Sequence, residues 1–326
     1  MRAVLPPSPG VSEPTLGELP DPQPATGEVL VQVRAAGLNR ADLLQLRGLY
    51  PPPPGESEVP GLELAGVVRE VGEGVEGWKA GDRVMALTAG GAHAELAAVP
   101  AGQLMLLPQN LSFADGAAIP EAGLTAWTNL VAEGGLAAGE TVLVTGANGG
   151  VGRTVVQLAH ALAARVLAAG RDPGRLAPLR ALGADELVLL GADLPDAVRE
   201  ATGGRGADLA LDLVGGEHLP RCLAALADRG RCVLVGLMAG PRAELDLADL
   251  LRRRLRLVGS VLRARPRDEK ARLVAAFTAF ALPRYADGRL TPQIDRTFSF
   301  GEIAAAYAHL ALGGVEGKVV VEMGRA

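Results

Sequence analysis

The chain has 326 residues, 48% hydrophobic and 21% charged, so it is long enough for two domains and too apolar for a disordered protein. Its net charge of −5 argues against nucleic-acid binding as the main role. The two cysteines, Cys222 and Cys232, exclude a disulfide framework and a four-cysteine zinc site. Because no long apolar run marks a signal peptide or a membrane span, we expect a cytoplasmic protein.

The first part of the chain, to about residue 118, has the pattern of a β-rich domain. Short apolar runs bounded by glycine and proline predict strands at 29–33, 65–71 and 82–87. The proline run at 51–54 predicts an extended loop, because proline has no N–H for a helix.

From about residue 119 to 261 short apolar strands alternate with helical patterns. Helices are predicted at 151–164 and 175–182, with Gly183 as a C-cap. The predicted strands are residues 142–145, 166–169, 186–190, 209–213, 232–236 and 257–261. This alternation predicts a doubly wound parallel sheet, that is, an α/β Rossmann domain over 119–261.

The last part of the chain predicts helices at 268–280 and 301–312 and a strand at 318–322. We expect this tail to return to the first domain, which then comprises residues 1–118 and 262–326.

The strand expected at 142–145 leads into a glycine-dense turn and an apolar-periodic helix. This order is typical of a dinucleotide cradle, in which glycines let the backbone approach a pyrophosphate at a helix N-terminus. We assign the following residues to the cradle: Gly146, Asn148, Gly149, Gly150, Val151 and Gly152.

The end of the second strand of such a unit selects the cofactor. An Asp or Glu there binds the ribose of NAD, whereas this chain has Gly170 followed by Arg171 and, four residues on, Arg175. Guanidinium groups suit a 2′-phosphate, so we favour NADPH. Two alternatives stay open: the arginines are solvated charges at a helix start, and Asp172 either caps that helix or binds a ribose.

Further cofactor contacts are expected where other strands of the sheet end, because ligands bind open α/β sheets at the carboxyl edge. On this ground we assign Gly215, Gly236, Leu237 and Met238 to the cofactor site.

Ordered motifs along the whole chain resemble those of the medium-chain dehydrogenase/reductase superfamily. They are Gly-Leu-Asn-Arg-Ala-Asp-Leu at 37–43, Pro-Gly-Leu-Glu-Leu-Ala-Gly at 60–66, Lys-Ala-Gly-Asp-Arg-Val at 79–84, Ile-Pro-Glu-Ala-Gly-Leu-Thr-Ala-Trp at 119–127 and Gly-Lys-Val-Val at 317–320. Within it the chain resembles the zinc-free quinone oxidoreductases, and residues 45–55 resemble the tumour-suppressor-inducible group. The resemblance implies a GroES-like catalytic domain beside the Rossmann domain.

The zinc ligands of the superfamily's alcohol dehydrogenases are missing. Their Gly-His-Glu motif is Gly61-Leu62-Glu63 here, residues 38–42 contain no cysteine, and the histidines form no local cluster. We therefore assign no metal ligand, and we favour reduction of an electron-poor acceptor over alcohol oxidation.

The resemblance also implies four further site residues. Asn39 would approach the nicotinamide or cap a helix at 40–46, and Tyr50 would orient or protonate the acceptor. Thr125 would contact the cofactor or be a helix-interior hydroxyl, and Lys318 would reach the cofactor or be a solvated lysine. We assign Asn39 and Tyr50 as catalytic, and Asn39, Thr125 and Lys318 as cofactor-binding.

Two other features have ordinary interpretations. His93 is expected in a turn, and the basic run at 252–256 is expected to be a solvated helix face near a dimer interface or the cofactor rim. Nothing aromatic is interleaved with that run, which argues against nucleic-acid binding.

The sequence hypothesis is an NADPH-dependent quinone oxidoreductase that transfers hydride without a metal. The resemblance implies a homodimer joined through the Rossmann domain. One alternative is an NADPH-dependent enone or 2-alkenal reductase, and another is a cofactor-sensing or RNA-binding protein with vestigial activity.

Overall fold

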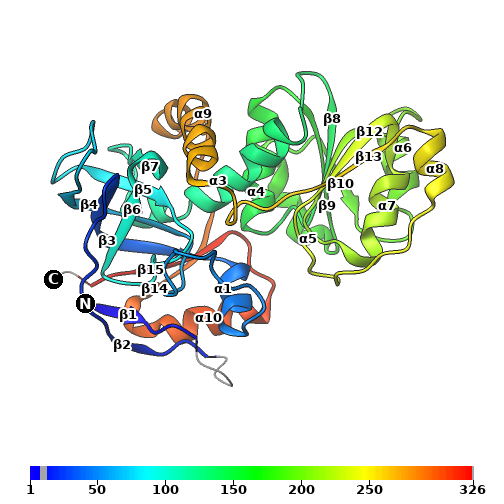
Figure 1. The fold of residues 1–326 in the computed structure, drawn as a ribbon. Coiled ribbons are helices and arrows are strands. Elements are labelled where there is room, and N and C mark those ends of the chain that lie inside the picture. Colours follow the sequence, from blue (N-terminus) through cyan, green and yellow to red (C-terminus); the bar gives the residue numbers. More distant parts are fainter. Residues whose placement is uncertain (8–12, 325–326) are drawn as a thin grey trace. The chain divides into compact units, whose positions relative to one another are not determined.

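The computed structural model describes residues 1–7 and 13–324, which form two compact units (Figure 1). One unit contains residues 1–124 and 262–326, and the other contains residues 125–261. We expected the division after residue 118, whereas it falls after Leu124, within helix α3 (Pro120–Trp127). The first turns of α3 belong to the first unit because Glu121 and Gly123 contact residues of that unit directly.

Within the described residues, the first unit is built on a seven-stranded sheet. Its strand order is β14-β15-β3-β4-β5-β7, with β6 also paired to β3, and only β14 and β15 run parallel to each other. The strands are β3 (Glu28–Leu38), β4 (Glu63–Val71), β5 (Arg83–Leu87), β6 (Leu96–Pro100), β7 (Leu104–Leu106), β14 (Ile294–Ser299) and β15 (Lys318–Glu322). The short strands β1 (Arg2–Val4) and β2 (Leu16–Glu18) pair antiparallel beside it.

The central strand β3 is longer than the expected 29–33, because its second half pairs with β15 on one edge and β4 on the other. Gly66 of β4 permits this close pairing, since a Cβ there would lie 2.1 Å from the Gln32 carbonyl oxygen. The expected strand at 318–322 is confirmed as β15, and it returns to the first unit as predicted.

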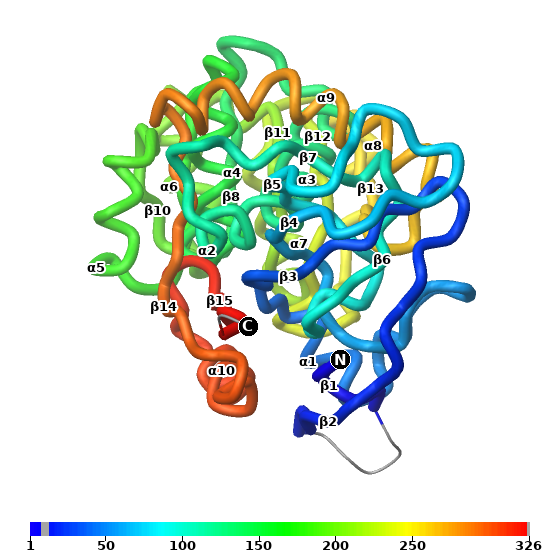
Figure 2. The backbone as a smooth tube through the Cα atoms, turned by 90° about the vertical axis from the view of Figure 1, so that its left-hand side faces the viewer, coloured from blue at the N-terminus to red at the C-terminus, as the bar shows by residue number. Residues whose placement is uncertain are grey.

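Helices cover this sheet and its ends. They are α1 (Arg40–Leu46), η1 (Ala101–Gln103), α2 (Phe113–Ala117), α9 (Arg267–Ala286), η5 (Phe300–Glu302) and α10 (Ile303–Leu312). In Figures 1 and 2 the orange helix α9 lies over the β7 side of the sheet, where it packs on η1 and β7, and α10 lies beside β14 and β15. Helix α9 extends past the expected residue 280 to Ala286, because Pro283 stands only in its last turn.

Residues 125–261, all of which the structure describes, form a six-stranded parallel sheet of order β10-β9-β8-β11-β12-β13. This is the expected Rossmann strand order. The strands are β8 (Thr141–Thr145), β9 (Arg165–Gly170), β10 (Glu186–Leu189), β11 (Ala207–Asp212), β12 (Leu226–Leu234) and β13 (Arg256–Gly259). The helices are η2 (Thr128–Ala132), α4 (Gly150–Ala161), α5 (Pro173–Leu176), η3 (Ala177–Leu182), α6 (Leu194–Ala201), η4 (Gly216–His218), α7 (Leu219–Ala224) and α8 (Leu247–Arg252).

Some observed elements of this unit differ from the expected ones, and local residues explain the difference. The helix expected at 175–182 is a short α-helix followed by the 3₁₀ turn η3, because Pro178 lacks the N–H of a continuous helix. Gly183 ends it with φ +103°, as the C-cap prediction requires. The last helix of the other unit likewise begins as the 3₁₀ turn η5.

Candidate functional site

The glycine turn after β8 is built for close backbone contact. Gly146 has φ +63°, a conformation that favours glycine, and the first turn of α4 packs back on it. A Cβ on Gly152 would lie 2.4 Å from the Gly146 carbonyl oxygen. Only hydrogen fits there, so the turn leaves the N-terminus of α4 open, with Gly149 as its N-cap.

A buried carboxylate that the sequence analysis did not single out fixes the neighbouring loop. Asp212, at the end of β11, accepts the Thr145 hydroxyl at 2.8 Å and the amides of Val214 and Gly215 at 2.9 and 3.0 Å. It therefore ties the residue before the glycine turn to the loop that carries Gly215. A buried Asp that ends an apolar strand just before Val-Gly-Gly is the signal that could have found it.

The end of β9 carries the residues assigned to cofactor selection. Gly170 lies beside Asn148, because a Cβ on it would lie 3.4 Å from the Asn148 side-chain oxygen. Arg171 is exposed at the strand end and Arg175 is half-buried in α5. Asp172 accepts the Gly174 amide at 2.8 Å as the N-cap of α5, so the cap alternative is the one that the structure shows.

The segment after β12 reaches the same edge of the sheet. A Cβ on Gly236 would lie 2.3 Å from the Leu213 carbonyl oxygen, and the Ala239 amide donates to the Val214 carbonyl at 2.9 Å. Leu237 and Met238 are exposed beside this contact. The residues assigned to the cofactor in this unit thus gather at the carboxyl ends of the strands, except for Thr125, which is buried in α3 with its carbonyl bonded to Asn129.

A buried ion pair occupies the centre of the first unit. The Lys318 ammonium lies 2.6 Å from Glu63 Oε1, and both side chains are almost completely buried. Lys318 also donates to the Leu38 carbonyl at 2.9 Å and to the Asn39 side-chain oxygen. The solvated-lysine alternative for Lys318 is therefore wrong, because β15 lies inside the sheet rather than at its edge.

Asn39 is held from both ends of its amide. Its nitrogen donates to Glu63 Oε1 at 3.0 Å, and its oxygen accepts from Lys318. Asn39 is also the N-cap residue of α1, but it is Asp42 that closes the cap, by accepting the Asn39 backbone amide at 2.7 Å. Asp42 is fully buried, and desolvation raises its pKa.

Tyr50 lies on the loop after α1 and is anchored by a buried arginine. Arg263 donates to the Tyr50 carbonyl at 2.9 Å and to the Gln45 side-chain oxygen at 2.6 Å, and its guanidinium lies 5.2 Å from the centre of the Tyr50 ring. Burial, followed by the charge of Glu121, raises the pKa of the Tyr50 phenol, so it stays protonated at neutral pH.

Glu121 lies beside the Lys318–Glu63 ion pair. Its backbone amide donates to Glu63 Oε2 at 2.9 Å, which places it in the first turn of α3 beside the ion pair. Desolvation, with the Glu63 carboxylate as the next cause, raises the pKa of the Glu121 carboxyl to about 8. At neutral pH this side chain is mainly a neutral acid. The motif at 119–127 marks this segment, but no local pattern in the sequence points to a role for Glu121.

Comparison with known proteins places this geometry in a family. Residues 25–109 match the alcohol dehydrogenase GroES-like domain, and residues 150–279 match a domain described as zinc-binding dehydrogenase. A quinone oxidoreductase of Lama guanicoe is 33% identical over 92% of this chain and 90% of its own length. The chain belongs to the quinone oxidoreductase family of medium-chain dehydrogenases/reductases.

Two further proteins are similar to this chain over nearly its whole length. A synaptic vesicle membrane protein VAT-1 homolog of Homo sapiens is 31% identical over 93% of this chain and 81% of its own length. The quinone oxidoreductase of Thermus thermophilus, solved also in complex with NADPH, is 37% identical with a TM-score of 0.83, covering 99% of this chain and 100% of that one. The protein is therefore an oxidoreductase of the nicotinamide-dependent type.

His93 of this oxidoreductase lies in a bend of the chain, as expected, but its side chain points inward. It is fully buried, its Nδ1 lies 2.8 Å from the Tyr307 hydroxyl, and its Nε2 lies 3.3 Å from the Gly37 carbonyl. Burial lowers the pKa of its imidazole, which therefore stays neutral and ties α10 to β3.

Within residues 1–7 and 13–324, no three His, Cys, Asp or Glu side chains form a metal-binding group.

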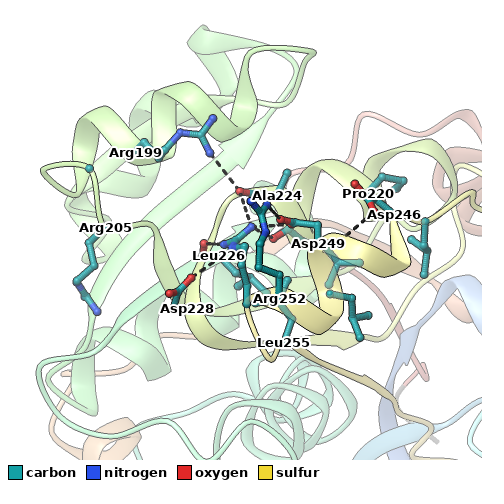
Figure 3. Close-up of a pocket in the computed structure, with 15 residues that line it drawn as sticks. Arg199, Arg205, Pro220, Ala224, Leu226, Asp228, Asp246, Asp249, Arg252 and Leu255 are labelled. Carbon is teal, nitrogen blue, oxygen red and sulfur yellow. Dashed lines mark hydrogen bonds and ion pairs between the residues drawn. The ribbon is translucent and has the colours of Figure 1, made fainter.

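A groove of about 790 Å³ lies on the unit formed by residues 125–261 (Figure 3). It lies at the amino ends of the strands, since Arg205, Leu226 and Leu255 line it just before β11 or at the starts of β12 and β13. Arg252 and Arg253 of the basic run reach into it and pair with Asp249 at 2.6 and 3.0 Å. Cofactors bind at the opposite edge, so this groove is not the cofactor site.

No helix in the described part of the chain is long and apolar enough to cross a membrane.

Replacing Gly152 by Ala will lower stability by about 1–3 kcal/mol, because its Cβ meets the backbone of Gly146 and Ala147. Thermal unfolding measures the change. Gly149→Ala is the matched control, since its Cβ comes no closer than 3.7 Å to another atom, and it should cost less than about 1 kcal/mol as a weaker N-cap. Equal losses in the two variants would contradict the close packing inferred here.

Replacing Lys318 by Met will lower the free energy of unfolding by about 3–5 kcal/mol, because it leaves the Glu63 carboxylate buried without its cation. Urea unfolding measures this loss. Adding Glu63→Gln to that variant should recover part of it, because the uncompensated charge is then gone. Lys79→Met, at an exposed position, serves as the control and should be as stable as the wild type. A Lys318→Met variant as stable as the wild type would refute the prediction.

Proposed function

We propose that the protein is an NADPH-dependent quinone oxidoreductase that works without a metal ion. The observation that carries the proposal is the Lys318–Glu63 pair: Glu63 follows Leu62, where the zinc enzymes have a histidine, and the cation against its carboxylate is an ammonium group. Membership of the quinone oxidoreductase family and the NADPH complex of the Thermus thermophilus relative support the same proposal.

The residues present fit a nicotinamide dinucleotide. The cradle of Gly146 and Gly152, which a Cβ would fill, suits a pyrophosphate at the N-terminus of α4. Arg171 and Arg175 would hold a 2′-phosphate, while Asp172 is engaged as a helix cap. When bound, the reduced cofactor supplies hydride to the acceptor.

The remaining site residues have roles that follow from their contacts. Gly215, Gly236, Leu237 and Met238 would contact the cofactor at the carboxyl edge of the sheet. Asn39, whose amide is fixed by Glu63 and Lys318, would orient the nicotinamide, and Tyr50 would donate a hydrogen bond to the acceptor. Thr125 and Lys318 stay in the cofactor assignment.

We also propose a homodimer formed through the Rossmann unit, in the cytoplasm. Strand β13 ends the sheet and exposes Leu257, and Leu247, Leu251 and Val261 are exposed nearby in sequence. An edge strand with apolar neighbours favours pairing with a second copy. Cys222 and Cys232 are free thiols, as a reducing compartment allows. Sedimentation as a monomer at micromolar concentration would exclude the dimer.

Purified protein with NADPH is expected to reduce simple benzoquinones and naphthoquinones well above the uncatalysed rate. Loss of NADPH absorbance measures this, with enones and NADH in parallel assays. The enone reductase alternative is favoured by the neutral acid at Glu121, because the enolate that hydride transfer leaves on an enone is more basic than the quinol anion that it leaves on a quinone. Turnover of enones but not quinones would replace the proposal with that alternative, and tight NADPH binding without any turnover would favour a cofactor sensor.

Replacing Arg171 and Arg175 by Ala should weaken NADPH binding about ten- to hundredfold and leave NADH binding nearly unchanged, because charge-assisted bonds to the 2′-phosphate are lost. Titration of dihydronicotinamide fluorescence measures both affinities. Arg180→Ala is the control, since this exposed arginine bonds the Asp185 carbonyl instead. Equal weakening of both cofactors would place the 2′-phosphate elsewhere.

A further inference from the structure

The two oxygens of the Asp212 carboxylate have unequal surroundings. Oδ1 accepts three bonds, from the Thr145 hydroxyl and from the amides of Val214 and Gly215. Oδ2 is buried and has no hydrogen-bond partner within the described part of the chain. A buried acceptor without a donor is destabilising, so the strength of the three bonds to Oδ1 must offset this cost. A charged acceptor makes these bonds stronger than a neutral amide oxygen would.

The Thr145 hydroxyl joins the ends of two neighbouring strands. It donates to Asp212 Oδ1 at 2.8 Å and accepts the Leu213 amide at 3.1 Å, so it bonds both the last residue of β11 and the residue after it. Thr145 itself ends β8 and stands directly before Gly146 of the glycine turn. The hydroxyl and the carboxylate therefore hold the two strand ends in register.

This pair of side chains lies where the strand order of the sheet reverses. From β8 the chain continues to β9 and β10 on one side of the sheet, and β11, β12 and β13 follow on the other side. The reversal thus falls between β8 and β11, which pair with each other. Open α/β sheets bind their ligands at such a switch point, beyond the carboxyl ends of the strands.

The loop that follows Asp212 packs closely against the segment after β12. Gly215 and Gly216 have φ +67° and +55°, a region that favours glycine. A Cβ on Gly215 would lie 2.6 Å from the Gly236 carbonyl oxygen, and one on Gly216 would lie 2.4 Å from the Ala239 carbonyl oxygen. The position of this loop therefore fixes the position of the neighbouring segment, and both carry residues assigned to the cofactor.

The order of the strands indicates which half of a dinucleotide this loop would meet. Arg171 follows β9, the glycine turn follows β8, and Leu213 follows β11, the next strand across the sheet. With the 2′-phosphate at Arg171 and the pyrophosphate at the N-terminus of α4, the adenosine half occupies the β9 side of the switch point. The nicotinamide half is left for the ends of β11 and β12.

We propose that Thr145 and Asp212 are positioning residues for the nicotinamide half of the cofactor. They act through the backbone of residues 213–216, which their hydrogen bonds fix before the cofactor binds, and neither side chain needs to touch the cofactor. The inference rests on the proposed function, because it takes a nicotinamide dinucleotide as the ligand. Loss of either side chain should weaken binding of the whole cofactor and spare binding of its adenosine half.

Asp212→Asn tests this with little change of shape. The amide oxygen can still face the three donors, but its bonds to them are weaker because it carries no charge. NADPH affinity should fall about tenfold, whereas affinity for 2′,5′-ADP, which contains only the adenosine half, should change less than about twofold. Fluorescence titration measures NADPH binding and calorimetric titration measures 2′,5′-ADP binding, at a temperature where each variant is folded.

Asp208→Asn is the matched control. Asp208 stands near the start of the same strand β11, where it accepts the Thr141 amide at 2.8 Å and pairs with Arg205. It too bonds a neighbouring strand, but at the amino ends of the strands, away from the switch point. This variant should bind NADPH and 2′,5′-ADP as tightly as the wild type, even if it is less stable.

Two substitutions of Thr145 test the other member of the pair. Thr145→Val removes the hydroxyl at nearly constant volume, and it should weaken NADPH binding about tenfold without changing 2′,5′-ADP binding. Thr145→Ser keeps the hydroxyl and should retain most of the NADPH affinity. A serine variant as weak as the valine variant would show that the hydroxyl is not the group that matters.

A measurement without any ligand follows the loop itself. In the wild type the amide hydrogens of Val214 and Gly215 should exchange slowly with solvent, because both are bonded to Asp212 Oδ1. In Asp212→Asn both should exchange at least about tenfold faster, while the Thr141 amide keeps its wild-type rate. Asp208→Asn should show the reverse pattern. Unchanged exchange of Val214 and Gly215 in Asp212→Asn would mean that the carboxylate does not fix the loop.

The outcomes separate this inference from the proposed function. If the wild type binds both ligands and the Asp212→Asn and Thr145→Val variants bind NADPH equally well, only this inference fails. Equal weakening of NADPH and 2′,5′-ADP would also overturn it, because the pair would then support the whole unit rather than one half of the site. If the wild type binds neither ligand, both proposals fall.

Discussion

The carboxylate of Glu63 is the constraint on which the first unit depends. It begins β4, is fully buried, and accepts bonds from the Lys318 ammonium, the Asn39 amide and the Glu121 backbone. These partners stand on β15, before α1 and in α3. A single buried charge therefore fixes the positions of segments that are far apart in the sequence, and each of them carries a residue of the proposed site. Because the charge is compensated by an ammonium, the arrangement is sensitive to loss of either partner.

In the Rossmann unit, glycines and one carboxylate fix the positions of separate backbone segments. Gly152 and Gly236 allow backbone segments to approach to distances that a Cβ would prevent, and Asp212 bonds the loops that result. The proposed cofactor contacts thus come from backbone shape, while the proposed acceptor chemistry comes from buried side chains. The two kinds of site respond differently to substitution, since the first is sensitive to added volume and the second to the loss of a charge.

Much of this could be predicted from the sequence, where the signal is local. The glycine turn, the alternation of strands and helices, and the Gly183 cap are set by neighbouring residues, and the structure confirms them. The second half of β3, with Ala35 and Ala36, has weak strand propensity and forms through pairing with β15. The buried setting of Lys318 and the inward position of His93 depend on that same pairing and on α10, which no local pattern reveals.

The pairing of β15 with β3 has a consequence for the order of folding. Val319 lies opposite Leu38, so the central sheet of the first unit is incomplete until β15 has been synthesised. Residues 125–261 form a continuous unit and have no such requirement. During translation the Rossmann unit can fold first, while the N-terminal strands keep an open sheet edge, with Glu63 uncompensated, until β15 arrives. The pairing of β15 with β3 is thus the step that completes the first unit.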